Sequence, residues 1–204
     1  MPVPDANAIR LLLDQLDQHV ADDLESDVLD FKPWQGPKDD LKLACEYAVC
    51  FANAGGGAVV FGVAEKVRGR AKAIHGARGY DLDVFRRGIF SGTRPGVAVE
   101  VFELVVVEGT GKLLVVRVPE GDSKPYGTSA GLFKQRVGKN CMPMDAMSFQ
   151  RAQVRSAALD WSGAPANGLT LHDLDPLQIE RARRVLRRNA PSSGLLELAD
   201  LAHL

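Results

Sequence analysis

The chain has 204 residues, of which 46% are hydrophobic, and a formal net charge of −1 at pH 7. This length suits one good-sized domain with a tail, or two small domains. The near-neutral charge excludes a global basic field, so any nucleic-acid ligand must be held by local basic patches. The sequence shows no signal peptide and no apolar run of membrane-spanning length, so we expect a soluble, cytoplasmic protein without a membrane contact.

The cysteines do not have the spacing of a disulfide framework or a zinc site. Cys45, Cys50 and Cys141 are odd in number and lack C-x-x-C spacing, and two of them lie in an apolar, helix-like stretch. In a cytosolic protein this pattern predicts reduced, buried thiols.

The first part of the chain is predicted to form a helix and then a short strand. Asp5 is a suitable N-cap, and apolar residues follow it at helical spacing: Ile9, Leu12, Leu13, Leu16 and Val20. An acidic cluster comes next: Asp22, Asp23, Glu25, Asp27 and Asp30. Val28–Lys32 alternates, with Leu29 and Phe31 on one face and Asp30 and Lys32 on the other, which is typical of a strand.

A glycine-rich turn between a helix and a buried strand is the centre of the predicted fold. We expect Asp39 or Asp40 to cap a mostly buried helix over Leu41–Asn53. The glycines at 55–57 permit a sharp reversal. The unbroken apolar run that begins Ala58–Val63 predicts a strand in the interior of a sheet.

The following residues add a helix, a hairpin and a last strand. A short helical segment carries Arg86 and Arg87, and a turn-rich connection joins strands over Val97–Val107 and Leu113–Val118. A further strand is expected over Leu132–Val137.

Domain organisation follows from where the composition changes. We expect one α+β domain over residues 1–160, with a mixed β-sheet packed against helices. A helix is expected over Met147–Trp161. Residues 161–168 are small and flexible, which is typical of a linker. Residues 169–204 are basic and are predicted to be helical, and we expect them to begin a further, winged-helix-like region.

Three sequence blocks carry most of the recognisable motifs of the chain. The first is Glu25-Ser26-x-x-Leu29-Asp30-Phe31-Lys32. The second is Ala48-x-x-Phe51-Ala52-Asn53-Ala54-Gly55-Gly56-Gly57-x-x-x-Phe61-Gly62-Val63. The third combines Lys124-Pro125-Tyr126 with Phe133-Lys134-Gln135-Arg136-Val137-Gly138. In order and spacing, these three blocks resemble the Schlafen AlbA-like domain family. The resemblance covers residues 20–146 and implies the family's mixed sheet packed on helices.

For the nuclease members of this family, the resemblance implies three acidic residues that bind a divalent metal and cut RNA, with transfer RNA as substrate class. The matching positions are Glu25, Asp30 and Glu65. Carboxylates are suitable ligands for Mg²⁺ or Mn²⁺, and Lys32 is expected to contact phosphate or neutralise the acids. Glu25 and Asp30 can converge only if Glu25 lies in the turn before the strand, because residues five apart on one strand face opposite ways.

This chain departs from the family pattern at two positions. Asp30 replaces the usual glutamate, and Ala64 stands where many members carry an acid, so Glu65 must supply the third carboxylate. If Asp30 is a solvated metal ligand, Asp30→Asn should abolish cleavage and change the free energy of unfolding by less than about 0.5 kcal/mol.

Basic residues and one aromatic residue are candidates for tracking a nucleic-acid backbone. They are Lys124, Tyr126, Lys134, Arg136, Lys139, Arg86 and Arg87. In this hypothesis Tyr126 stacks on a base.

The sequence therefore favours two functions of different classes. The first is a metal-dependent endoribonuclease acting on structured RNA, with tRNA as the expected substrate and anti-phage defence as a suitable role. The second is a non-catalytic DNA- or RNA-binding module of a transcriptional regulator. A homodimer is also expected, because the Schlafen nucleases have two related lobes and this chain has one.

Overall fold

The computed structural model describes residues 3–155, 175, 177, 180–181 and 184–185. The chain divides into two units, residues 1–160 and 161–204. All helices and strands from α1 to α6 belong to the first unit. The predicted linker over 161–168 lies outside the described residues, as does nearly all of the predicted helical segment over 169–204.

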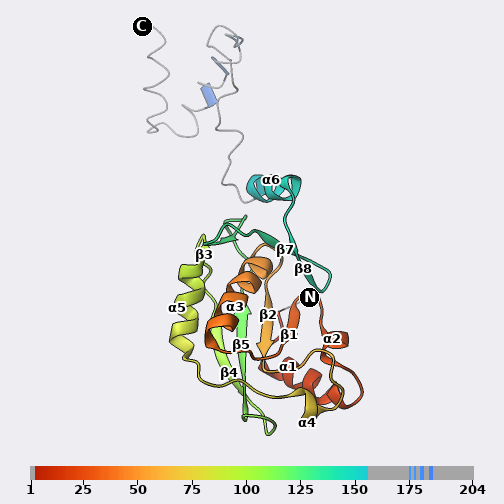
Figure 1. Ribbon diagram of the computed structural model, residues 1–204. Coiled ribbons are helices and arrows are strands. Elements are labelled where there is room, and N and C mark those ends of the chain that lie inside the picture. Colours follow the sequence, from red (N-terminus) through yellow and green to blue (C-terminus); the bar gives the residue numbers. More distant parts are fainter. Residues whose placement is uncertain (1–2, 156–174, 176, 178–179, 182–183, 186–204) are drawn as a thin grey trace. The chain divides into compact units, whose positions relative to one another are not determined.

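A four-stranded mixed sheet forms the centre of the fold (Figure 1). Its strands are β1 (Leu29–Lys32), β2 (Gly57–Phe61), β4 (Glu100–Val105) and β5 (Lys112–Val118), in the order β1-β2-β5-β4. β1 is parallel to β2, whereas the other two pairs are antiparallel. The predicted α+β class, the interior position of the 58–63 strand and the β4–β5 hairpin are therefore confirmed.

Helices cover both faces of this sheet. α3 (Pro37–Ala52) and α5 (Leu82–Gly92) pack on one face, where Val59 and Phe61 of β2 point. Figure 1 shows these two helices side by side. The opposite face, with Val60 of β2, packs against α1 (Ala6–Leu13) and the segment around it. β2 is buried along its whole length, because helices cover both faces of the sheet and its apolar side chains pack on each face in turn.

Shorter elements complete the domain. They are η1 (Asp14–Asp17), α2 (Ala21–Leu24), α4 (Arg70–Ala73), β3 (Thr93–Arg94), β6 (Gly127–Thr128), β7 (Lys134–Val137), β8 (Asn140–Pro143) and α6 (Ala146–Arg155). Asp5 caps α1 as predicted, since its Oδ1 accepts a hydrogen bond from the Ala8 amide at 2.8 Å. Among the described helices, none has the length and apolar character needed to cross a membrane.

The glycine turn joins α3 to β2 as the sequence indicated. Gly56 has φ = +81°, and the amide of Gly56 donates to the Phe51 carbonyl at 3.0 Å. Gly57 is needed for a close approach, because a Cβ there would lie 2.2 Å from the Phe51 ring. The turn therefore needs one glycine for its backbone angle and another for packing.

The predicted start of the α3 helix was wrong. The helix begins at Pro37 with Gly36 as N-cap, one turn before Leu41. A proline fits the first helical position because its missing N–H would have no intrahelical partner. Asp40 is buried inside the first turn, where its Oδ2 accepts from the amides of Gln35 and Gly36 at 2.7 and 2.8 Å. Asp40 therefore binds the backbone just before the helix and is not the N-cap of a helix that begins at Leu41.

The last strand expected from the sequence is half of a hairpin. β7 pairs with β8, which the sequence did not predict, and the pair contacts α3. The Phe133 and Phe149 rings, whose centroids are 4.9 Å apart, pack the chain before β7 against α6. The described part of the helix predicted over Met147–Trp161 is α6.

The thiol prediction was wrong for two of the three cysteines. Cys50 of α3 and Cys141 of β8 form a disulfide with a Cα–Cα distance of 5.8 Å, and Cys45 is a buried free thiol. The disulfide forms because the β7–β8 hairpin packs against α3. The sequence does not predict this contact, since the two cysteines are 91 positions apart.

Candidate metal centre

The turn before β1 places Glu25 near Asp30. Glu25 is the C-cap of α2 and has an extended backbone (φ −67°, ψ 151°). The next residue, Ser26, forms a bridge with Leu29 that turns the chain into β1. Glu25 then reaches over the strand, and its Oε1 accepts a hydrogen bond from the Phe31 amide at 3.1 Å. This is the turn position that convergence with Asp30 required.

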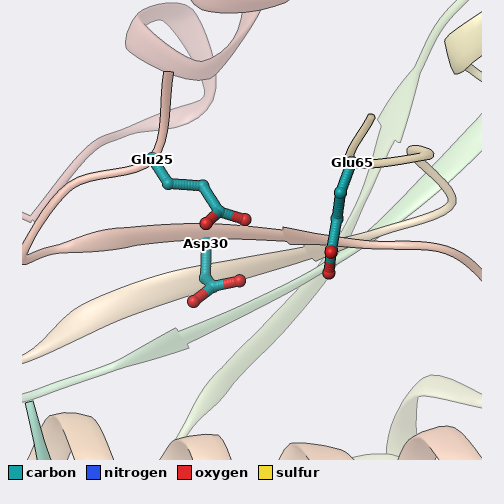
Figure 2. Close-up of side chains that lie close together, drawn as sticks. All are labelled: Glu25, Asp30 and Glu65. Carbon is teal, nitrogen blue, oxygen red and sulfur yellow. The ribbon is translucent and has the colours of Figure 1, made fainter. Parts of the chain in front are cut away.

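Parallel pairing of β1 and β2 brings Glu65 to the same place. Lys32 of β1 lies opposite Phe61, the last residue of β2, and its carbonyl accepts from the amides of Gly62 and Val63. The chain that leaves β2 therefore passes beside the end of β1. One carboxylate oxygen each of Glu25, Asp30 and Glu65 lies within 4.8 Å of the others. Figure 2 shows the three carboxylates facing a common space.

The Lys32 ammonium lies among these three carboxylates. Its Nζ is 2.6 Å from Asp30 Oδ1 and 3.6 Å from Glu25 Oε1, and it also donates to Glu65 Oε1. The Lys32 side chain is only partly exposed, so the ion pairs are shielded from water.

Burial and the neighbouring charges shift the pKa of several of these groups. Burial, together with the Asp30 carboxylate, raises the pKa of Glu25 to about 7. Burial acts to lower the pKa of Lys32, but the Asp30 and Glu65 carboxylates outweigh it, and the net pKa is raised. Burial and the Asp30 carboxylate also raise the pKa of the Tyr47 hydroxyl. The site therefore combines a permanently charged ammonium with one carboxylate that titrates near neutrality.

Arg136 holds the acidic site in place through hydrogen bonds to Asp30 and to the backbone around it. Its Nη1 donates to Asp30 Oδ2 at 2.7 Å, and its Nη2 donates to the carbonyls of Ser26 and Leu29 at 2.6 and 3.0 Å. The guanidinium lies 4.9 Å from the centre of the Phe51 ring. The side chain is 2% exposed, which corrects the expectation that Arg136 contacts a nucleic-acid backbone. It holds both Asp30 and the turn that carries Glu25.

A pocket of about 330 Å³ opens above the three acids. Its charged lining has five carboxylates and three ammonium groups: Asp22, Glu25, Asp30, Glu46, Glu65, Lys32, Lys134 and Lys139. When all are ionised, the negative charges exceed the positive by two, so the pocket alone repels phosphate. A larger pocket of about 670 Å³ near Asn53 and Arg151 does not include the acids.

Two of the predicted backbone-tracking lysines lie at the rim of this pocket. Lys134 Nζ is 2.6 Å from Glu46 Oε2, and Lys139 Nζ is 2.9 Å from Asp22 Oδ2. They lie at the start of β7 and in the turn after it. The structure thus brings Lys134 and Lys139 together with the acids, each held in an ion pair.

The other predicted backbone contacts lie elsewhere. Lys124 donates to the Ala54 carbonyl at 2.7 Å and pairs with Glu120. Arg86 pairs with Asp83, and both Arg86 and Arg87 belong to α5. Figure 1 shows α5 and the β7–β8 hairpin on either side of α3, so these two arginines are not part of the acidic pocket.

Tyr126 is a core residue. It is 9% exposed and packs in the cluster around α3. Its hydroxyl accepts from the Ser123 amide at 3.3 Å. A side chain buried in this cluster is not available to stack on a base, which corrects the stacking expectation. Asn53, which the sequence indicated only as a helix end, binds the Tyr126 backbone on both sides, at 2.7 and 2.8 Å, and the Lys134 carbonyl at 2.8 Å.

The three carboxylates suit a divalent metal ion. Oxygen ligands lie about 2.0–2.6 Å from Mg²⁺ or Ca²⁺, so two ligands of one ion are separated by at most about 5 Å. The 4.8 Å limit for Glu25, Asp30 and Glu65 satisfies this condition. Lys32 binds the same carboxylates, so a metal ion and the ammonium compete for them.

Several solved structures are similar to this chain, including the following two. The DIP2311 protein from Corynebacterium diphtheriae has a similar fold, with a TM-score of 0.57 and 22% identity over 92% of this chain and 39% of that chain. This chain thus spans about two fifths of that protein's length. The N-terminal domain of a putative ATP-dependent DNA helicase RecG-related protein from Nitrosomonas europaea gives a TM-score of 0.41 and 20% identity over 86% of this chain and 99% of that domain.

No curated protein matches the chain. The sequence model of the family described as "Schlafen, AlbA_2" matches residues 25–145, from the first acid of the site to the residue before α6. This match contains all three sequence blocks and covers more than half of the chain. The chain therefore belongs to the Schlafen AlbA_2 family.

Proposed function

We propose that the protein is a metal-dependent endoribonuclease that cuts structured RNA, with tRNA as its substrate class and anti-phage defence as a suitable role. The observation that carries this proposal is the approach of Glu25, Asp30 and Glu65 to within 4.8 Å of one another inside a pocket. Three carboxylates so close together raise the free energy of the folded state unless positive charge lies among them. Lys32 supplies one positive charge there, and a divalent ion would supply two.

Glu25, Asp30 and Glu65 would hold Mg²⁺ or Mn²⁺. Such an ion activates water and stabilises the charge that develops on a scissile phosphate. It would also cancel the two excess negative charges of the pocket and so remove the repulsion that phosphate meets there. Lys32 would then be displaced from the carboxylates and be free to contact a phosphate oxygen.

Lys134 and Lys139 would position the RNA backbone. Both ammonium groups lie at the rim, in ion pairs with half-buried or exposed carboxylates. Exchange of Asp22 for phosphate at Lys139 costs little, since exposed ion pairs contribute about 0–1 kcal/mol. Phosphate contacts of this kind make RNA affinity depend on salt concentration.

Cleavage of total tRNA by the purified 204-residue protein is the direct test. We expect cleavage with MnCl₂ or MgCl₂ and none with EDTA. Glu65→Gln should reduce the rate more than about 10²-fold, because changes beyond the metal ligands already cost about 10–100-fold. Glu120→Gln is the matched control, since Glu120 is an exposed partner of Lys124 outside the acidic pocket.

Lys32 at the centre of the acids favours a second candidate, a non-catalytic DNA- or RNA-binding module. In that case the ammonium is the permanent counter-ion of the three carboxylates. The parent protein would then bind nucleic acid without metal-dependent cleavage. Affinity would fall on Lys134→Ala or Lys139→Ala and would not change on Glu65→Gln.

We further propose that the protein acts as a homodimer. This chain supplies one lobe, whereas the Schlafen nucleases enclose RNA between two, and two-fold dimers are the commonest soluble oligomers. Light scattering at micromolar concentration, with and without tRNA, should give twice the monomer mass of 22.0 kDa. A monomer under both conditions would exclude the two-lobed arrangement.

A further inference from the structure

We infer that the Cys50–Cys141 disulfide is a redox-sensitive lock on the acidic pocket. When the bond is intact, it holds the β7–β8 hairpin on α3, and the hairpin holds Asp30 and the Glu25 turn through Arg136. When a dithiol reductant opens the bond, the hairpin loosens and the acids lose their support. The structural coupling stands apart from the proposed nuclease function, and only its effect on RNA cleavage rests on that function.

Arg136 and Cys141 are direct partners across the hairpin. The β7–β8 register places Arg136 opposite Cys141, and Arg136 Nη1 lies 3.6 Å from Cys141 Sγ. The same guanidinium donates to Asp30 and to the carbonyls of Ser26 and Leu29. The covalent anchor and the support of the acids therefore belong to one cross-strand pair, so movement of either residue moves the other.

The hairpin depends strongly on this anchor. Most side chains of β7 and β8 are half-buried or exposed, so the hairpin contributes little to the core. Its other attachments are polar: Arg136 with Asp30, Ser26 and Leu29, Lys134 with Glu46, Lys139 with Asp22, and Asn53 with the Lys134 carbonyl. Segments with few buried apolar contacts open locally at low free energy.

The bond can be reached from the acidic pocket. Cys141 lines that pocket and is partly exposed, whereas Cys50 is fully buried. A thiolate of the dithiol would attack Cys141 Sγ, break the S–S bond and release Cys50, which takes up a proton. The second thiol then displaces Cys141, leaving two cysteine thiols and the oxidised reductant. Arg136 favours this departure, because a nearby cation stabilises a thiolate.

Hydrogen exchange of the full chain, without metal or RNA, tests the lock. After treatment with dithiothreitol under native conditions, amides of residues 134–143 and of residues 25–32 should exchange at least about tenfold faster. Those of β5, in the interior of the sheet, should not change. Cys141→Ser should show the fast exchange without reductant and no further response to it.

Cys45→Ser is the matched control, since Cys45 is the buried free thiol and should leave the response to dithiothreitol intact. Two results would overturn the lock: failure of dithiothreitol to reduce the folded protein, or faster exchange in residues 134–143 with residues 25–32 unchanged. If exchange responds but neither redox state cleaves tRNA, the lock stands and the proposed nuclease function falls. If the protein is an active nuclease, reduction should lower its cleavage rate.

Discussion

Lys32 Nζ lies 2.6 Å from Asp30 Oδ1, at the point where three carboxylates meet. Both residues belong to β1 and point to the same face, since they are two positions apart on one strand. The protein thus carries a cation of its own within the site where a metal ion would bind. Competition between this ammonium and a divalent ion is a property that can be measured without knowing the substrate.

Lys32→Met should make the stability of the protein depend on divalent metal. Without metal, three carboxylates lose their shared counter-ion, and we expect a loss of about 3 kcal/mol in the free energy of unfolding. With MnCl₂ the variant should regain most of this loss, because the ion no longer competes with an ammonium. Thermal unfolding with and without MnCl₂ measures the difference.

Lys134→Met is the control for that experiment. Lys134 lines the same pocket but pairs with Glu46, outside the three acids. Its response to MnCl₂ should equal that of the parent. Equal metal responses of Lys32→Met and the parent would show that the ammonium and the ion do not share ligands.

Asp30→Asn should unfold more easily than the sequence indicated. The sequence suggested a solvated carboxylate, but Asp30 is 2% exposed and binds both Arg136 and Lys32. Removing one partner of a buried ion pair costs about 3–5 kcal/mol. Glu65→Gln, whose side chain is 29% exposed, should cost less than about 1 kcal/mol. Urea unfolding at pH 7 compares the two, and equal stability of Asp30→Asn and the parent would contradict the buried pair.

Local patterns predicted the part of the site that lies on β1. Strict alternation placed Asp30 and Lys32 on one face, and the distance between Glu25 and Asp30 required a turn that the structure contains. The third acid, Glu65, follows the strand whose apolar run marked it as interior. These placements concern residues close together in the chain, whereas the choice of Glu25, Asp30 and Glu65 as one acidic set was implied by the resemblance to the Schlafen AlbA-like family.

Long-range pairings were beyond the reach of the sequence. Arg136 looked like a surface cation because nothing local shows that Asp30 lies beneath it, 106 residues away. β8 was missed because Asn140–Pro143 lacks an apolar–polar alternation and contains a proline. The disulfide depends on that hairpin, so the thiol prediction failed for the same reason.

Asn53→Ala should weaken the attachment of the β7–β8 hairpin. The Asn53 amide makes three hydrogen bonds, to the amide and carbonyl of Tyr126 and to the carbonyl of Lys134. At about 1 kcal/mol each, their loss should lower the free energy of unfolding by about 3 kcal/mol. Denaturant unfolding of Asn53→Ala and of Asn140→Ala, an exposed residue of β8, compares them. A change of less than about 0.5 kcal/mol in both would contradict the role of Asn53.

Glu25 should make the protein less stable as the pH rises towards 7 in EDTA. Burial and Asp30 raise its pKa from 4.5 to about 7 in the folded state. Between these values the unfolded chain has lost the proton that the folded protein keeps, so unfolding releases a proton. A higher pH therefore favours unfolding across this window, and the effect levels off above pH 7, where both states are ionised.

Urea unfolding of the parent and of Glu25→Gln between pH 4.5 and 8 isolates this contribution. The difference in the free energy of unfolding between the two proteins should change across pH 4.5–7 and become constant above it. Glu120→Gln is the control, because the Lys124 ammonium lowers the pKa of Glu120, so Glu120 adds no loss of stability as the pH rises. If Glu25 also binds metal, the affinity for Mn²⁺ should rise over the same window, since the ion must displace the proton. A parallel pH dependence of Glu25→Gln and the parent would mean that Glu25 ionises at its ordinary pKa and is not desolvated.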